Sequence, residues 1–242
     1  MTVRLFVDFD GTVTQEDVGN AFFRRFGGQR CDEIVRMYRE GRISAAGCYT
    51  LEAEAMGAFD PVEVTSYVRR FAIDETFHSL VRFARERGYS LTIVSDGLDL
   101  YIREILAANG LDGVGFFANR AEFVPTGESG RSKLKLEFPL QDEECTRCAC
   151  CKRNLMLTQS ADEDVIVLVG EGFSDMCPAR FADVVFAKKE LQTHCQRENI
   201  SYAPYADFND VVEKLTEMTR DGKRLRKRTR AEVRRRTAFR EE

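Results

Sequence analysis

The sequence predicts an α/β fold: a mainly parallel sheet with helices on both faces, and a block of helices inserted after the first strand. Three apolar runs, at residues 3–7, 91–94 and 165–169, are typical of strands that are buried on both faces. Helical patterns separate these runs, and strands that alternate with helices form parallel sheets. Residues 16–74 read as helical throughout, so we expect them to form the inserted block.

The other elements follow from local patterns along the chain. Pro61 suits the first turn of a helix, Gly88 can end the helix that precedes it, and a later helix stops at Gly110. A last helix is expected to begin near Asp207. We expect two short strands at 113–124 and 133–139, joined as a hairpin. A further strand followed by a helix is expected at 183–199.

Composition indicates a globular protein. The 242 residues suffice for one large domain with a sizeable insertion, and 43% of them are hydrophobic and 31% charged. No stretch approaches the ~20 apolar residues of a membrane span, and the N-terminus lacks a signal-peptide pattern. We therefore expect a cytoplasmic protein with no membrane partner, in which the eight cysteines are reduced thiols or metal ligands.

The net charge of −4 hides an asymmetry along the chain. Residues 221–242 carry a balance of +6, so residues 1–220 stand at −10. Binding of nucleic acid by this acidic body is not expected. The basic end is either a solvated, partly helical extension or a segment that binds RNA, an acidic partner or the chain's own body.

Polar side chains follow each of the three buried runs: Asp8 and Asp10, Ser95 and Asp96, and Glu171 and Asp175. In open α/β sheets, ligands bind at the carboxyl ends of the strands. Two carboxylates held close together repel each other, and a bound hard cation, which prefers oxygen ligands, usually offsets this repulsion. An ordinary strand end with solvated acids would explain the first pair alone, but it does not explain the recurrence.

The segments DFDGTVT, IVSDG and GEGFSD, with a lysine between the last two, resemble the four motifs of the haloacid dehalogenase (HAD) superfamily of phosphohydrolases. The likeness covers nearly all of residues 1–215, and the inserted helices resemble the phosphoserine phosphatase subclass. The resemblance implies a Rossmann-like, HAD-like core at 1–14 and 76–215, a helical cap at 15–75, and a basic extension at 216–242. The segments ECTRCACCKRN, VSDGLD and SYAPYADF are further similar to the phosphatases of bacterial methionine salvage, which act on 2-hydroxy-3-keto-5-methylthiopentenyl-1-phosphate.

This resemblance implies roles for particular residues. Asp8 would be the nucleophile that forms an aspartyl-phosphate, and Asp10 the general acid and base. Ser95 and Lys152 would stabilise the phosphoryl group. Mg²⁺, or Mn²⁺ in its place, would be bound by Asp8, Asp10, Glu171 and Asp175. The phosphorylated metabolite would contact Asp17, Arg42, Ser95, Asp96 and Gly97.

Two features leave alternatives open. The last motif usually begins Gly-Asp, and the longer side chain of Glu171 moves its carboxylate by ~1 Å, which Mg²⁺ tolerates badly. Lys133 and Lys135 are rivals of Lys152 for the lysine role.

The alternatives to a methionine-salvage substrate are phosphoserine, phosphocholine or phosphoethanolamine. A further alternative is a catalytically impaired binding protein. The sequence does not indicate an oligomeric state.

Four cysteines lie within seven residues at Cys145, Cys148, Cys150 and Cys151. This spacing allows three interpretations: a Zn²⁺ site, a disulfide or redox pair, or thiols that shape the loop before Lys152. Zinc sites normally draw on two separated pairs of ligands, which the adjacent Cys150 and Cys151 do not provide.

Overall fold

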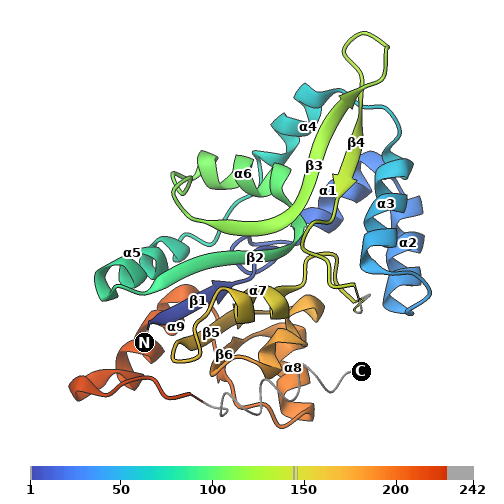
Figure 1. Ribbon diagram of the computed structural model, residues 1–242. Coiled ribbons are helices and arrows are strands. Elements are labelled where there is room, and N and C mark those ends of the chain that lie inside the picture. The colour runs from blue at the N-terminus through green and yellow to red at the C-terminus, as the bar shows by residue number, and fades with distance from the viewer. Residues whose placement is uncertain (1, 144, 146, 228–242) are drawn as a thin grey trace. The chain divides into compact units, whose positions relative to one another are not determined.

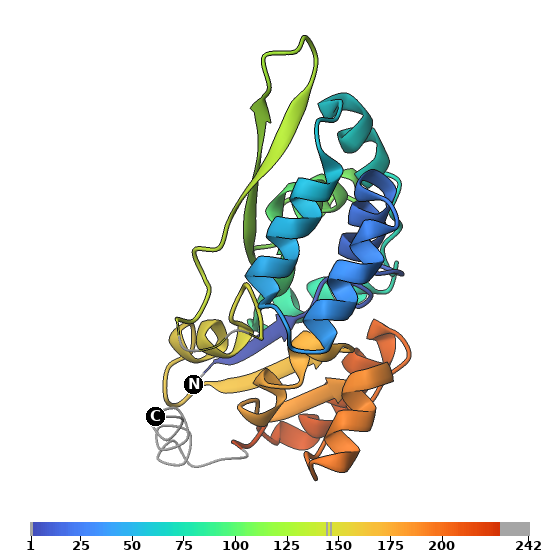
Figure 2. The ribbon, with the colours of Figure 1, turned by 90° about the vertical axis from the view of Figure 1, so that its right-hand side faces the viewer.

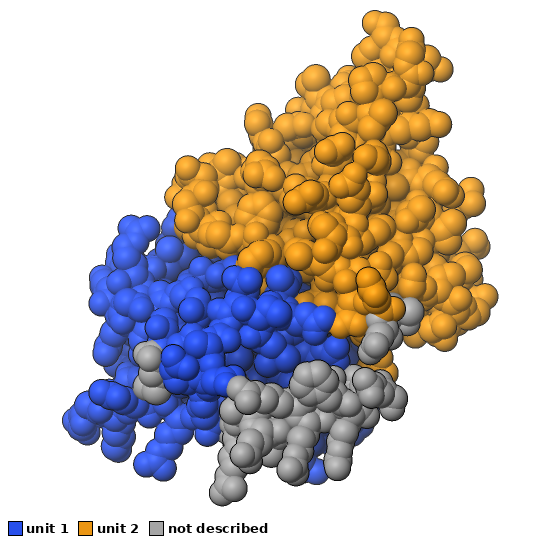
Figure 3. All heavy atoms as spheres, in the orientation of Figure 1, with its two compact units in different colours: residues 1–8, 74–93, 152–242 blue, residues 9–73, 94–151 orange. Residues whose placement is uncertain are grey.

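A computed structural model describes residues 2–143, 145 and 147–227 of the chain (Figure 1). It divides into two compact units (Figure 3). The first unit consists of residues 1–8, 74–93 and 152 onward, and the second of residues 9–73 and 94–151. The domain boundaries expected from the sequence stay a prediction, and the basic end beyond residue 227 lies outside the described residues.

The predicted mainly parallel α/β fold is confirmed. The strand order is β4-β3-β2-β1-β5-β6-β7, and β1 pairs in parallel with both β2 and β5. The β5–β6 and β6–β7 pairs are also parallel, whereas β3 and β4 form the predicted antiparallel hairpin. The strands are β1 (Val3–Val7), β2 (Ser90–Leu98), β3 (Phe116–Pro125), β4 (Ser132–Glu137), β5 (Val165–Gly170), β6 (Val184–Ala187) and β7 (Ala203–Pro204).

In the first unit, the helices are α5 (Phe77–Arg87), α7 (Lys152–Thr158), α8 (Lys189–Arg197) and α9 (Phe208–Met218). The strand β5 is buried along its whole length, as its unbroken apolar run predicts. Helices α5 and α9 pack together through the rings of Phe77 and Phe208, whose centroids are 5.0 Å apart. Gly88 ends α5 in the left-handed conformation, and the side chain of Asp207 caps α9.

The second unit contains the helical block and the hairpin. Its helices are α1 (Val18–Gly27), α2 (Arg30–Arg39), α3 (Ala45–Met56), α4 (Pro61–Val68) and α6 (Asp99–Ala108). Side chains of Asp17, Ser44 and Asp60 cap α1, α3 and α4. The β3–β4 hairpin runs beside the helical block (Figure 2), and Phe59 and Ser132 exchange two backbone hydrogen bonds of 2.9 Å there.

Among the α-helices and strands of the described residues, two were not expected from the sequence. Helix α7 begins at Lys152 with Lys-Arg-Asn, which gives no apolar periodicity, and β7 is only two residues long. In the part of the chain that the structure describes, no helix is long and apolar enough to cross a membrane.

Candidate active site

Lys152 is the centre of a buried charge cluster in the first unit. Its ammonium group lies 2.5 Å from Oδ1 of Asp8 and 2.7 Å from Oδ1 of Asp175. The side chains of Lys152 and Asp175 are fully buried, and that of Asp8 is 7% exposed. Buried charges are tolerated only when they are paired and hydrogen-bonded, so the three groups hold one another in place.

The electrostatics of this cluster keep Lys152 charged. Burial lowers the pKa of Lys152, but the carboxylates of Asp175 and Asp8 outweigh burial and hold it above its usual value. Burial, together with the charge of Asp8, raises the pKa of Asp175 to about 6 although Lys152 opposes the shift.

The loop after β5 is shaped around Asp175. Oδ2 of Asp175 accepts hydrogen bonds from the backbone N–H groups of Glu171 (3.0 Å) and Gly172 (3.2 Å). A Cβ atom at Gly170 would lie 2.4 Å from the same oxygen, so only glycine fits there. Asp175 is therefore an orienting group that holds both Lys152 and the last motif.

Glu171 faces two lysines. Its Oε2 lies 2.7 Å from Nζ of Lys189 and 4.0 Å from Nζ of Lys188. Burial raises the pKa of Glu171, and Lys189 opposes that shift. Lys189 begins α8 with a φ of 49°, a conformation that is uncommon for residues other than glycine.

In the second unit, Asp10 is surrounded by donors. Ser95 Oγ (3.1 Å) and the Tyr101 hydroxyl (3.2 Å) donate to Oδ2 of Asp10, and the backbone N–H of Gly19 donates to Oδ1 at 3.1 Å. A Cβ atom at Gly97 would lie 1.8 Å from the Tyr101 oxygen, which explains the glycine after Ser95 and Asp96. These bonds fix the orientation of the Asp10 carboxyl group.

Asp96, expected to contact substrate, is engaged by the chain itself. Its Oδ1 accepts hydrogen bonds of 2.7 Å from the backbone N–H groups of Ala149 and Cys150. The side-chain amide of Asn119 donates to the carbonyl oxygen of Asp96 at 2.6 Å.

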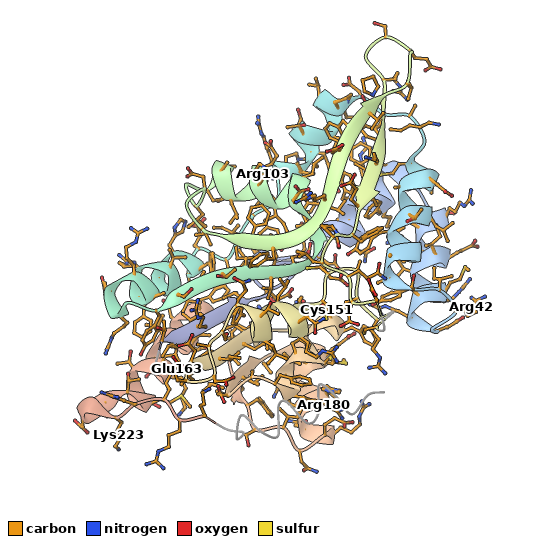
Figure 4. All side chains as sticks on the ribbon, viewed as in Figure 1. Arg42, Arg103, Cys151, Glu163, Arg180 and Lys223 are labelled. Carbon is orange, nitrogen blue, oxygen red and sulfur yellow. The ribbon has the colours of Figure 1, made fainter. Side chains whose placement is uncertain are left out.

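The remaining predicted residues lie at the surface. Asp17 is exposed, and its side chain accepts a hydrogen bond from the N–H of Asn20 as the cap of α1. Arg42 follows α2 (Figure 4) and pairs with Glu40 at 2.8 Å, with about half of each side chain exposed. The rivals of Lys152 both lie on β4, where Lys135 pairs with Glu137 in solvent.

All eight cysteines have free thiols, and Cys148, Cys150 and Cys151 are buried. The Cys148 and Cys151 thiols are hydrogen-bonded to each other, which together with burial holds the pKa of Cys148 far above its usual value. Among residues 2–143, 145 and 147–227, no group of three or more His, Cys, Asp or Glu side chains could hold a metal ion. The structure therefore gives no support to a Zn²⁺ site at the cysteines.

The donors of the first unit suit a hard cation in kind. Asp8 and Glu171 offer carboxylate oxygens. The charge of Asp8 contributes to the raised pKa of Glu171, so the two carboxylates interact electrostatically. Asp175 is already held by Lys152 and two backbone amides. Asp8 and Glu171 are thus the residues of this unit that would hold Mg²⁺.

Comparison with known proteins identifies the class. The Putative Phosphatase family model matches residues 3–218, so the chain belongs to that family. A solved structure described as a phospho-aspartyl intermediate analogue of phosphoserine phosphatase has a TM-score of 0.67 at 19% identity. The match covers 88% of this chain and 98% of the other. A HAD family hydrolase from Salmonella enterica has a TM-score of 0.69 at 18% identity, covering 91% and 72%.

The predicted class, a phosphatase, and the predicted fold, similar to that of phosphoserine phosphatase, are thereby confirmed. Two proteins that are similar in sequence share a more specific name, 2-hydroxy-3-keto-5-methylthiopentenyl-1-phosphate phosphatase. The protein from Lysinibacillus sphaericus is 29% identical over 88% of this chain and 94% of its own length. The protein from Exiguobacterium sibiricum is 29% identical over 89% and 97%.

Sequence reasoning missed three residues around these groups: Tyr101, Asn119 and Lys189. Tyr101 and Asn119 each contact a partner more than 20 residues away, which no local pattern reveals. Lys189 offered a signal, because the pair Lys188-Lys189 directly follows a buried strand at its carboxyl end.

Proposed function

We propose that the protein is a metal-dependent phosphatase that hydrolyses a small phosphorylated metabolite through an aspartyl-phosphate on Asp8. The observation that carries this proposal is the position of Lys152, held within 2.7 Å of both Asp8 and Asp175. A fully buried ammonium group next to a carboxylate nucleophile is suited to stabilise the charge of a transferred phosphoryl group.

The proposed roles follow from these contacts. A carboxylate oxygen of Asp8 attacks phosphorus, and Lys152 offsets the negative charge that gathers there. Asp10 donates a proton to the leaving alcohol and later takes one from water, with its carboxyl group oriented by Ser95 and Tyr101. Mg²⁺, when bound at Asp8 and Glu171, supplies further neutralisation of the phosphoryl oxygens.

We further propose 2-hydroxy-3-keto-5-methylthiopentenyl-1-phosphate as the substrate. The shared name of relatives that match 88–89% of this chain supports this choice. Phosphoserine is the second candidate, because solved structures with the same fold are described as phosphoserine phosphatases. Values of kcat/KM for these two esters, phosphocholine and phosphoethanolamine separate the candidates; a preference for phosphoserine would overturn the first choice.

The mechanism is tested by Asp8→Asn, with Glu163→Gln as a control that alters an exposed acid of the same unit. We expect Asp8→Asn to abolish hydrolysis of p-nitrophenyl phosphate with Mg²⁺ while circular dichroism stays unchanged, and the control to keep full activity. Turnover by Asp8→Asn at the wild-type rate would refute the nucleophile assignment. A wild-type chain that turns over no ester with Mg²⁺ or Mn²⁺ would favour the impaired binding protein.

A further inference from the structure

We propose that Asp96 is a positioning residue: its carboxylate fixes the loop at residues 147–151, and with it the start of α7, where Lys152 lies. This inference rests on the proposed function in one respect, namely that Lys152 takes part in phosphoryl transfer. It assigns Asp96 to the chain's own backbone instead of to substrate.

The contact between Asp96 and the loop is a double one. A single carboxylate oxygen receives the N–H groups of Ala149 and Cys150, both at 2.7 Å. Hydrogen bonds to an ionised acceptor are shorter and about twice as strong as neutral ones. Asn119, which is fully buried, holds the backbone of Asp96 in turn.

The loop is anchored at neighbouring points as well. The backbone N–H of Cys151 donates to the carbonyl oxygen of Leu140 at 2.8 Å, and the Tyr38 hydroxyl of α2 donates to the carbonyl oxygen of Arg147. The thiols of Cys148, Cys150 and Cys151 in this loop are buried. Within this set, Asp96 supplies the charged contact, and it binds the two residues that directly precede Cys151.

Chain length makes this anchor matter for Lys152. Cys150 is two residues before Lys152, and two residues span at most about 7 Å. Cys151, labelled in Figure 4, is the link between them. Because Nζ of Lys152 must lie within 2.7 Å of two carboxylates, a shift of the loop moves the ammonium group off its partners. A misplacement of ~1 Å can lower a rate ~100-fold.

The test compares Asp96→Ala and Asp96→Asn with a matched control. Asp99→Asn removes the same charge three residues away, where Oδ1 of Asp99 binds the N–H of Ala121 instead of the loop. Two assays are run on the full chain. Steady-state kinetics with p-nitrophenyl phosphate give kcat and KM, and mass spectrometry gives the rate at which a thiol reagent labels the loop cysteines.

We expect Asp96→Ala to lower kcat about 100-fold, to change KM less than about twofold, and to speed labelling of Cys148, Cys150 and Cys151 by about tenfold or more. Asp96→Asn, whose amide oxygen still accepts both N–H groups, should restore most of kcat and of the protection. If Asp96→Ala does not fold, Asp96→Ser, which is too short to reach the loop, replaces it.

Three results would overturn the proposal. A rise in KM with unchanged labelling would make Asp96 a substrate contact, and faster labelling with unchanged kcat would separate the loop from Lys152. Unchanged kinetics together with unchanged labelling would show that Asp96 does not anchor the loop. Failure of the proposed function is distinguishable, because a wild-type chain without turnover still reports the anchor through labelling.

Discussion

Glu52 gives the protein a pH dependence of stability that can be calculated from its surroundings. It lies on α3 at helical spacing from Cys48 and Met56, all three are buried, and Cys48 Sγ donates to Oε2 of Glu52 at 3.7 Å. Burial raises the pKa of Glu52 to about 8; the Cys48 contact opposes the shift, and the charge of Asp17 adds to it. The carboxyl group is therefore mostly protonated at neutral pH.

The sign and size of the effect follow from linkage. The folded state binds the Glu52 proton more tightly than the unfolded state, where the pKa is 4.5, so stability is greatest at low pH. It falls as the pH rises from about 4.5 to about 8. At 1.36 kcal/mol for each pH unit, this interval corresponds to a loss of at most about 5 kcal/mol.

The perturbation is Glu52→Gln, which keeps the shape of the neutral acid and cannot ionise. We expect the free energies of unfolding of variant and wild type to be similar at pH 4.5. The difference should then grow in favour of the variant, reaching several kcal/mol at pH 8. Urea unfolding followed by circular dichroism at intervals of one pH unit measures this difference.

Glu54→Gln is the matched control, because Glu54 is exposed on the same helix. Its difference from wild type should stay within about 0.5 kcal/mol at every pH. A Glu52→Gln difference that is equally flat across the pH range would refute the reasoning, since Glu52 would then ionise as readily in the folded state as in the unfolded one.

Three further predictions concern the first unit. Lys152→Met removes the ammonium group that Asp8 and Asp175 share, so urea unfolding should show a loss of about 3–5 kcal/mol at pH 8. The loss should be smaller at pH 5, below the raised pKa of Asp175, where that carboxyl group is protonated; equal losses would contradict this. Glu171→Asp draws the carboxylate back from Lys189 and should tighten Mg²⁺ binding about threefold in isothermal titration calorimetry, whereas weaker binding would show that the longer side chain suits the ion. Phe77→Ala should lower stability by about 3–5 kcal/mol in the same urea assay, and a loss below 1 kcal/mol would mean that α5 and α9 close over the gap.

Much of the fold could be predicted because its signals are local. Predominantly apolar runs indicate buried parallel strands, as β1 and β5 are. Gly88 and Asp207 mark helix ends by their own conformational preferences. Helix α7 escaped prediction because its polar start is stabilised by the burial of Lys152 among carboxylates, which is a tertiary effect.

For the candidate site, the sequence predicts individual residues and does not predict the contacts between them. The carboxyl ends of buried strands pointed to Asp8, Asp10 and Glu171, because a parallel sheet gathers these ends at one edge. The contacts of Tyr101 with Asp10 and of Lys189 with Glu171 depend on how loops close in three dimensions. The contacts of Asp96 also could not be predicted from the sequence. Its place in a motif predicts a contact with substrate, whereas its carboxylate accepts hydrogen bonds from the chain's own backbone.

The charges around Lys152 suggest why metal and substrate should bind together. Three carboxylates of the first unit are paired with three ammonium groups. Asp8 and Asp175 contact Lys152, and Glu171 contacts Lys188 and Lys189. This set is close to neutral as it stands, so a divalent cation alone would leave an excess of about +2 in a partly buried place. A phosphate monoester carries a charge of about −1.5 to −2 at pH 7 and offsets that excess. Because coupling between two ligands is reciprocal, a phosphate analogue should tighten Mg²⁺ binding by the factor by which Mg²⁺ tightens binding of the analogue.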